Sequence, residues 1–353
     1  MKNKRLSFIV SVILIALMLG FIYILEQVMP HTHMLFTVLK KGAIYALVAV
    51  SMNLLNGFTG LFSLGQAGFM LIGAYTYAVL TIPQEARASV YQYFDGGLIQ
   101  FSLNPILAII IAGALTAVFA YLIGLPVLKF KSDYLAIATL GFAEIVRALC
   151  QWDKLGPITN GSNILRKFAT FDSTIFPFVV SGICIAIIVL LINSTYGRAF
   201  KAIRDDEYAA EAMGINLARH KQLAFCISSF FAGISGALLA MFQTTIQASA
   251  FKAAMTYEIL LIVVIGGIGS VTGSCISAFL FIACNEWWLR FLDVERAGVP
   301  LLRPGFRKVV FSVIIMIVVL FFRQGIMGNR EFSVSGIIRR IKNKDSAKRK
   351  NEV

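Results

Sequence analysis

The length, composition and charge of the chain exclude most classes of soluble protein. The sequence has 353 residues, of which 58% are hydrophobic and only 14% charged, and its mean hydropathy is +0.79. A soluble domain is closer to one-half apolar and one-quarter charged, because a polar surface must cover a single core. The same proportions exclude a disordered chain, and the lack of a glycine period or a high cysteine density excludes collagen-like and disulfide-rich scaffolds. The sequence therefore predicts an all-α, polytopic membrane protein.

The basic excess of the chain fits this class. There are 32 Lys and Arg against 18 Asp and Glu, which gives a formal net charge of +14. A basic chain can bind nucleic acid, but in a chain this apolar the excess is typical of cytoplasmic loops beside anionic lipid. We therefore expect membrane lipid and not nucleic acid as the charged partner. His31 and His33 lack a carboxylate or thiolate nearby in sequence, so no metal site is expected.

Ten apolar segments are long enough to be transmembrane helices, which need about 20 mostly apolar residues. The first follows a basic N-terminus, and no small-x-small cleavage site comes after it, so we expect a retained span and not a cleaved signal peptide. The predicted spans cover residues 6–25, 38–55, 61–81, 105–128, 134–150, 175–193, 223–246, 256–270, 272–289 and 306–322. The positive-inside rule then places both termini in the cytoplasm.

The chain is predicted to have three parts. Residues 1–37 form an N-terminal span with an outer loop, residues 38–330 form the main transmembrane domain, and residues 331–353 form a basic cytoplasmic tail. The tail is interpreted as a topological anchor beside anionic lipid.

Two segments are too polar and too rich in glycine for ordinary spans. Residues 56–76 contain five glycines together with Ser63 and Gln66, and residues 266–273 read Gly-Gly-Ile-Gly-Ser-Val-Thr-Gly. An interrupted backbone at membrane depth needs protein or an aqueous cavity to satisfy its N–H and C=O groups, so broken or re-entrant helices are typical of a transport pathway. Close helix packing through small residues is the alternative, and it stays open, above all for residues 266–273. The candidate pathway residues are Ser63, Gly65, Gln66, Gly68, Glu144, Gly267 and Gly269.

Glu144 and Arg147 carry opposite charges within the span predicted at 134–150. A charge in hydrocarbon costs several kcal/mol unless it is paired or hydrated. Residues three apart share a face of a helix, so the two side chains can neutralise each other. We interpret them as a structural or gating salt bridge, and a proton-coupled role of Glu144 or Asp133 is the alternative.

The loop after the span predicted at 175–193 has the pattern of short amphipathic helices. Phe200, Ile203, Ala210 and Met213 fall at helical spacings, charged residues cover the other positions, and Gly214 is a natural helix stop. The pattern predicts a short helix, or a pair of helices, across the cytoplasmic mouth of the bundle, suited to docking against another protein. A solvated loop helix without a partner is the alternative.

Several motifs, in order along the chain, resemble those of LivM-type permeases, the branched-chain amino-acid subunits of bacterial ABC importers. Residues 197–216 resemble the ATPase-coupling loop of that family. Its other signatures resemble the segments 53–69 with 72–75, 134–142 with Glu144, 266–273 and 321–328. The likeness extends from about residue 40 to 330.

Two positions depart from the pattern of the family. ABC importers generally carry Glu-Ala-Ala-x-x-x-Gly in this loop, but here Tyr208 stands at the Glu position, with Glu207 and Glu211 on either side. Asn160 stands in an outer loop where the family commonly has the second residue of Thr-Gly-Gly. The later positions of the coupling motif are Ala209, Ala210 and Gly214.

The resemblance implies a permease subunit that is not an enzyme and binds no cofactor. In agreement, the sequence contains no Gly-x4-Gly-Lys-Ser/Thr phosphate loop. Two separate cytoplasmic ATPase subunits would use the ATP, a second related permease would complete the pore, and an extracytoplasmic binding protein would deliver the solute to the bacterial plasma membrane. The ATPase-coupling residues implied are Arg198, Arg204, Asp205, Glu207, Ala209, Ala210, Glu211 and Gly214.

Three alternatives to a branched-chain amino-acid permease stay open. The first is a related ABC permease for urea, short amides or another small solute, which composition does not separate from the main interpretation. The second is a secondary transporter driven by an ion gradient. The third is a membrane scaffold that anchors a soluble partner through residues 197–216.

Overall fold

The structure, a computed structural model, describes residues 17–29, 33–94, 96–129, 132–293, 306–321 and 325–328. A helix at Leu17–Val28 is followed by α2 (Met34–Asn53), the π-helical turn η1 (Leu54–Phe58), α3 (Gln66–Thr81), α4 (Gln84–Val90), α5 (Pro105–Val127) and α6 (Ser132–Gln151). Then come η2 (Asp153–Leu155), α7 (Gly156–Thr159), β1 (Leu165–Arg166), α8 (Ile175–Ile192), α9 (Thr195–Asp205), α10 (Glu207–Ala212) and α11 (Leu217–Gln243). The last elements are β2 (Thr245–Ile246), η3 (Ala248–Ala250), α12 (Ala253–Gly266), α13 (Val271–Ala283), η4 (Cys284–Trp288), η5 (Arg290–Asp293) and α14 (Phe306–Phe321).

Each of the ten predicted spans coincides at least partly with a helix in the described residues, which confirms the all-α, polytopic class. Within the part of the chain that the structure describes, six helical stretches have 18 residues or more and are apolar enough to cross a membrane: Met34–Phe58, Pro105–Val127, Tyr134–Gln151, Ile175–Ile192, Leu217–Gln243 and Val271–Asp293. The helix Leu17–Val28, α3, α12 and α14 are shorter. The first part of the span predicted at 6–25 and the tail at 331–353 lie outside the described residues.

Local sequence signals explain where several of these helices begin and end. Asn104 caps α5 by accepting a hydrogen bond from the Ile106 N–H (3.0 Å), and Pro105 takes the first helical position, where no N–H is needed. Asn216 caps α11 through the Arg219 N–H (3.0 Å). These caps fix the helix ends at the positions where polar and apolar sequence meet.

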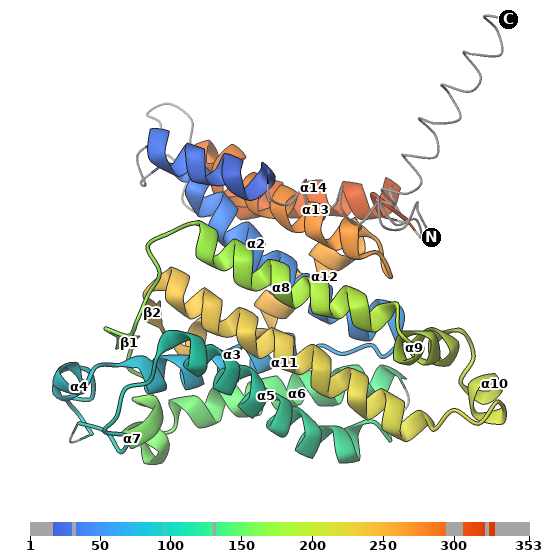
Figure 1. Ribbon diagram of the computed structural model, residues 1–353, viewed down its shortest axis with the longest axis horizontal. Coiled ribbons are helices and arrows are strands. Elements are labelled where there is room, and N and C mark those ends of the chain that lie inside the picture. The colour runs from blue at the N-terminus through green and yellow to red at the C-terminus, as the bar shows by residue number, and fades with distance from the viewer. Residues whose placement is uncertain are drawn as a thin grey trace, which may run out of the picture.

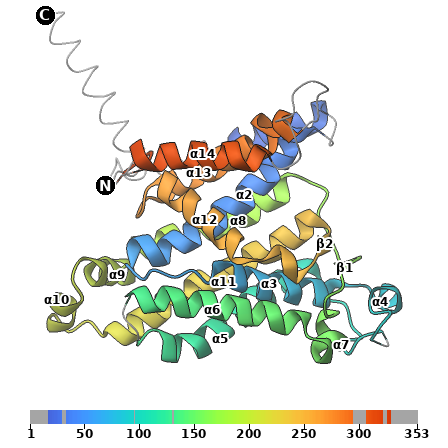
Figure 2. The ribbon, with the colours of Figure 1, turned by 180° about the vertical axis from the view of Figure 1, so that it is seen from behind.

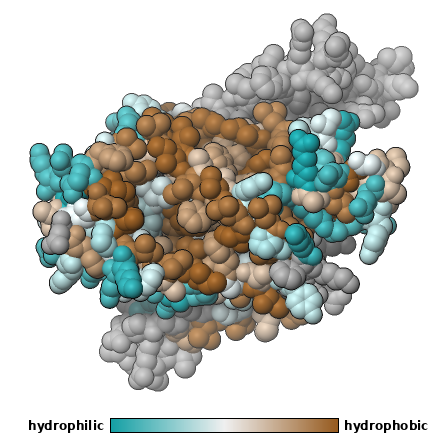
Figure 3. Space-filling model, turned by 90° about the horizontal axis from the view of Figure 1, so that it is seen from below, coloured by the Kyte–Doolittle hydropathy of each residue, from teal (hydrophilic) through white to brown (hydrophobic). Residues whose placement is uncertain are grey.

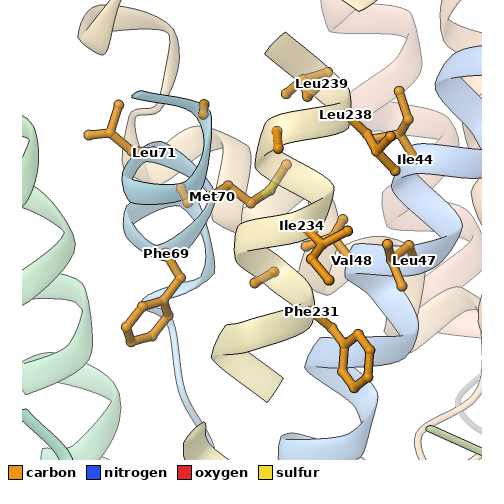
Figure 4. Close-up of a cluster of buried hydrophobic side chains, with 14 of the residues drawn as sticks. Ile44, Leu47, Val48, Phe69, Met70, Leu71, Phe231, Ile234, Leu238 and Leu239 are labelled. Atoms are coloured by element: carbon orange, nitrogen blue, oxygen red, sulfur yellow. The ribbon is translucent and has the colours of Figure 1, made fainter. Parts of the chain in front are cut away.

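The long helix α11 forms the centre of the bundle and packs against α2, α3 and α5 (Figure 1). Figure 4 shows α11 between α3 and α2, with apolar side chains from all three helices meeting in the core. These include Phe69, Met70 and Leu71 of α3, Phe231, Ile234, Leu238 and Leu239 of α11, and Ile44, Leu47 and Val48 of α2. The core of the bundle therefore joins helices that are far apart in the sequence.

The polar connections gather at two opposite ends of the bundle. One end carries α9 and α10, and the other carries α4, α7 and a two-stranded antiparallel sheet in which Leu165 pairs with Ile246 (Figures 1 and 2). Figure 3 shows a predominantly apolar band between hydrophilic patches at these ends. This distribution is typical of a membrane-spanning bundle whose two ends contact water.

Candidate functional site

The first glycine-rich segment interrupts the helical backbone, as the sequence predicts. The α-helix α2 ends at Asn53 and continues as the π-helical turn η1, and regular helix resumes only at Gln66. Gly60 has φ +76°, a left-handed conformation that glycine adopts at little cost. The open stretch satisfies part of its backbone locally, because Leu61 N–H bonds to the Leu55 carbonyl (3.0 Å).

The second glycine-rich segment is a tight turn between α12 and α13. Gly267 has φ +113°, and the Ser270 side chain caps α13 by accepting from the Gly273 N–H (3.1 Å). A methyl group added at Gly273 would lie 2.0 Å from the carbonyl oxygen of Gly266. The glycines of this segment break the helix and also allow the two helices to pack in backbone contact. The role of the segment in a pathway stays a prediction.

Asn53 joins the two interrupted segments. Its side chain is fully buried, and its Oδ1 accepts a hydrogen bond from the Gly269 N–H (2.8 Å). Its Nδ2 donates to the Ser270 carbonyl (2.9 Å), to Ser274 Oγ (2.8 Å) and, more weakly, to the Gly267 carbonyl (3.3 Å). One side chain of α2 thus satisfies polar groups along the whole turn between α12 and α13.

The helix α9, at one end of the bundle, contacts the first interrupted segment. Arg204 Nη1 donates to the Gly57 carbonyl at 3.1 Å, while Nε and Nη2 bond to Asp205 Oδ1 at 3.0 and 2.8 Å. Lys201, three residues earlier on the same face, places its Nζ 5.6 Å from the centre of the Phe58 ring. Figure 2 shows the end of α2 beside α9.

The two remaining motifs also contact the interrupted segments. Thr139 of α6 accepts a hydrogen bond from the Leu64 N–H (3.0 Å), just before α3 begins. Residues 325–328 fold back onto the turn after α12, where Ile326 N–H bonds to the Ile265 carbonyl (2.8 Å). The five motifs that the sequence analysis singled out therefore meet in one region of the fold. We call this region the junction: residues 53–69, 139, 204, 266–274 and 325–328.

The candidate pathway residues near the start of α3 are held in a buried polar environment. Gln66 is fully buried, and its Nε2 donates to Ser228 Oγ (3.1 Å), which itself donates to the Ser51 carbonyl (2.7 Å). Gln66 Oε1 has no hydrogen-bond partner among the described residues. Ser63 is also buried, and Gly65 and Gly68 lie against α6, where a methyl group at Gly68 would be 2.7 Å from Ala143 Cα.

Glu144 lies apart from the other candidate pathway residues. Its carboxylate accepts from Arg147 Nε (2.7 Å), which confirms the predicted pairing along α6, and Arg147 Nη1 also donates to Gln151 Oε1 (3.2 Å). The two side chains remain 39% and 25% exposed, so the pair lies on the surface of the chain and outside the junction.

The predicted helix pair of the coupling loop is confirmed as α9 and α10. Phe200, Ile203 and Ala210 are buried, whereas Met213, which follows the last turn of α10, is 84% exposed. Asp206 separates the two helices and caps α10 through the N–H groups of Tyr208 (2.9 Å) and Ala209 (3.1 Å).

Among the candidate coupling residues, Arg204 is the one that reaches the junction. The others lie on α9, on α10 or just after it, where Glu207 pairs with Lys221 (2.5 Å). Gly214 has φ +84° and no atom near its missing Cβ. The exposed members of the set are Arg198, Arg204, Asp205, Glu207, Ala209, Glu211 and Gly214.

The sequence analysis missed two features that the structure reveals. Asn53 is a polar residue inside a predicted span, which is a recognisable signal of function or of close polar packing. Lys41 of α2 forms an ion pair with Glu286 of η4, beside the ring of Tyr45. This second pair was predictable, because Lys41 and Glu286 carry opposite charges and lie near those ends of their predicted spans, 38–55 and 272–289, that face the same side of the membrane.

The fold and the junction define a multi-pass membrane protein whose interrupted spans are tied to a helix pair at one end of the bundle. The chain belongs to the family described as "Branched-chain amino acid transport system / permease component", whose model matches residues 34–321. No solved structure matches the chain.

Curated relatives agree with this family. The chain is 33% identical over 277 residues to the high-affinity branched-chain amino acid transport system permease protein LivM of Escherichia coli K12, a match that covers 69% of this chain and 61% of that protein. It is 22% identical over 318 residues to a probable LivM permease of Methanocaldococcus jannaschii (80% and 90% covered). It is 24% identical over 324 residues to the LivH permease protein of E. coli K12 (88% and 97% covered). The match therefore spans less than two-thirds of the length of E. coli LivM.

Proposed function

We propose that this chain is the membrane-embedded permease subunit of an ABC importer that carries branched-chain amino acids. The observation that supports this most strongly is the meeting of five motifs at the junction, where α9 contacts an interrupted span. Relatives whose names state branched-chain amino acid transport support the substrate class.

In this proposal two separate ATPase subunits bind ATP and dock against α9 and α10. The chain itself binds no cofactor and has no catalytic residues. Tyr208 and Met213 are 86% and 84% exposed next to Glu207 and Glu211, a mixture of apolar and acidic groups that suits a docked protein. Closure of the ATPases would move α9, and α9 would move the interrupted spans so that the pathway opens alternately to each side. Both termini and the α9 end then lie in the cytoplasm of a bacterial plasma membrane.

A second, related permease subunit would complete the pore. The Glu144–Arg147 pair is partly exposed on a spanning helix, and a charge pair facing hydrocarbon is unfavourable. Protein or an aqueous pathway on this face of α6 removes that cost. Gly141, on the same helix, has open space around its missing Cβ, which allows another helix to approach closely. E. coli K12 has both a LivM and a LivH relative of the chain.

An extracytoplasmic binding protein would deliver the solute at the opposite end of the bundle, where α4, α7 and the β1–β2 sheet lie (Figure 1). This arrangement explains why a permease needs no tight site of its own, since the binding protein supplies the affinity.

The proposal is tested by uptake of labelled leucine into vesicles that hold this chain, the second permease, two ATPases and the binding protein. Uptake should require ATP. Glu211→Lys or Gly214→Asp should leave the chain in the membrane and abolish uptake, because both change the exposed surface of the helix pair. Gly182→Ala, at a glycine of α8 with no atom near its missing Cβ, serves as the control substitution and should transport normally.

Three results would contradict the proposal. Unchanged uptake with both coupling variants would exclude docking through α10. Uptake by the chain alone on an ion gradient would identify a secondary transporter. Uptake of urea or acetamide in preference to leucine would identify a permease for amides.

A further inference from the structure

We infer that Asn53 and Arg204 are positioning residues that make the two interrupted segments move as one unit with α9. The inference rests on the proposed function for its transport consequence, and on the contacts of the junction for its structural content. It assigns specific side chains to the step between movement of a cytoplasmic helix and opening of a pathway.

The first observation is the contact between the two interrupted backbones. A methyl group added at Gly57 would lie 2.5 Å from the Gly269 nitrogen and 1.9 Å from Asn53 Oδ1. The π-helical turn η1 and the turn after α12 thus touch through backbone atoms, without a side chain between them. One segment cannot shift toward the other without a clash, so their relative position has little freedom in this direction.

The second observation is the way in which Asn53 holds this contact together. Its amide bonds to the Gly269 N–H, to the Ser270 carbonyl and to Ser274 Oγ. The bonds to Ser270 and Ser274 are buried, and the bond to Gly269 is partly buried. A buried polar group without a partner is unfavourable, and separating the segments would leave several such groups unsatisfied at once. Asn53 therefore resists movement of one segment without the other.

The third observation is that α9 forms a hydrogen bond to the π-helical turn at this contact. Arg204 donates to the carbonyl of Gly57, the residue that touches Gly269, and Asp205 holds the remaining guanidinium nitrogens in place. Gly60 leaves room for this approach, since a methyl group there would be 3.1 Å from Arg204 Cα. The Arg204 side chain is 39% exposed, so it extends from the surface of α9 to the contact.

The fourth observation is that the backbone to which α9 bonds is a π-helical turn. A π-helical turn contains a wider hydrogen-bonding pattern than an α-helix, and such turns are frequent at functional sites in helices. The turn η1 joins α2 to the open stretch before α3. Movement of α9 would therefore act on the Gly57 carbonyl at the point where the backbone is least regular. Direct contacts therefore lead from α9 through Arg204, Gly57 and Asn53 to Gly269.

Hydrogen–deuterium exchange on the purified full chain in detergent tests the structural part without any partner or substrate. Asn53→Leu should raise exchange about tenfold in peptides that cover both 54–60 and 266–270, because it removes the hydrogen bonds that hold the turn after α12 to the residue directly before η1. Arg204→Ala should raise exchange in the same two segments by about threefold, less than Asn53→Leu, because its hydrogen bond is partly exposed to water.

Matched controls distinguish a specific increase in exchange at 54–60 and 266–270 from a general destabilisation of the fold. Asn193→Ala removes an exposed asparagine that bonds only within its own helix, and Arg219→Ala removes an exposed arginine near α9, so neither should alter exchange at 54–60 or 266–270. Arg204→Lys keeps the charge and one donor but loses the fork on Asp205, and it should fall between wild type and Arg204→Ala. Faster exchange in only one of the two segments, or in α9 alone, would overturn the inference.

The transport consequence is measured in the reconstituted importer. Arg204→Ala should keep ATP hydrolysis but raise the number of ATP molecules hydrolysed per leucine transported, with partial recovery in Arg204→Lys. A merely structural role would lower hydrolysis and transport together and would contradict the inference. If no variant and no wild-type chain shows ATP-driven uptake, the proposed function fails, whereas the exchange results still decide whether the junction moves as one unit.

Discussion

Gly73 of α3 and Gly233 of α11 bring two central helices into backbone contact. A methyl group added at Gly73 would lie 2.1 Å from the Gly233 carbonyl oxygen, and one at Gly236 would lie 2.0 Å from the Met70 carbonyl oxygen. In a bilayer the helices gain no hydrophobic free energy by leaving lipid, so close packing of this kind must hold the bundle together.

Gly73→Ala should therefore destabilise the bundle strongly. The added methyl group cannot fit without separating α3 from α11, and overpacking of a core costs about 1–3 kcal/mol. Thermal unfolding of the purified chain in detergent should show a lower midpoint. Gly141→Ala and Gly182→Ala, at helical glycines with no atom near the missing Cβ, should leave the midpoint unchanged or raise it slightly. Equal midpoints for Gly73→Ala and these controls would contradict the prediction.

Asn160 fits its position through both its backbone conformation and its side-chain hydrogen bonds. The residue ends α7 in the left-handed region (φ 63°), which asparagine tolerates better than other side chains with a Cβ. Its buried Nδ2 also donates to the carbonyls of Val90 (3.1 Å) and Ile164 (3.3 Å). Asn160→Ala should lose both advantages and cost about 2–3 kcal/mol of stability.

The matched comparison for this position is Asn160→Gly. Glycine removes the same two hydrogen bonds but accepts the left-handed backbone, so the glycine variant should be more stable than the alanine variant by about 1 kcal/mol. Chemical unfolding of both variants in detergent gives the difference. An alanine variant as stable as the glycine variant would show that the backbone conformation carries no strain.

Tyr91, at the same end of the bundle as Asn160, should make the stability of the fold sensitive to alkaline pH. Its phenol donates to the Ile158 carbonyl (2.9 Å), and burial raises the pKa of Tyr91 from 10.0 to about 12, although the neighbouring Arg87 guanidinium opposes this shift. The pKa in the folded chain is higher than in the unfolded chain. The contribution to stability is therefore complete below pH 10 and is lost as the pH rises toward 12.

Thermal unfolding at a series of pH values checks this. Between about pH 10 and 12 the wild-type midpoint should fall more steeply than that of Tyr91→Phe, which has no phenol to ionise. Tyr93→Phe is the control, because Tyr93 is 77% exposed and its loss should leave the steep fall in place. Parallel curves for wild type and Tyr91→Phe would exclude the predicted linkage.

Variants of Glu144 and Arg147 distinguish a structural salt bridge from a proton-coupling role of Glu144. Glu144→Gln leaves Arg147 charged without its carboxylate in a spanning helix, which should cost about 1–2 kcal/mol, less than for a fully buried pair because both side chains are partly exposed. The amount of folded chain in the membrane and the leucine uptake should both fall. The double variant Glu144→Gln with Arg147→Gln should recover much of both, since no unpaired charge remains.

An ion-gradient transporter that uses Glu144 gives a different result. It would lose uptake in the double variant as completely as in the single one, with a normal amount of protein in the membrane. Glu85→Gln, at an exposed carboxylate of α4, is the control for removal of a negative charge and should leave the amount of folded chain in the membrane unchanged.

The sequence alone determined the features that depend on neighbours along the chain. Runs of apolar residues located the spans, because a helix must satisfy its own backbone in lipid. Glycine density located both interrupted segments, and helical spacing located the α9–α10 pair and the Glu144–Arg147 bridge. Spacing did not separate the buried apolar residues of this pair from Met213, which follows the last turn of α10 and is exposed.

Only the tertiary structure decided which of these features meet. Gly57 and Gly269 touch across more than two hundred residues, and Arg204 reaches them from a helix that lies between them in the sequence. Hydropathy has no information about such pairs, because it varies little around helices that are apolar on every side. The pairs are fixed by where small residues let backbones approach and by which buried amide finds partners there, and both conditions exist only once the helices have packed.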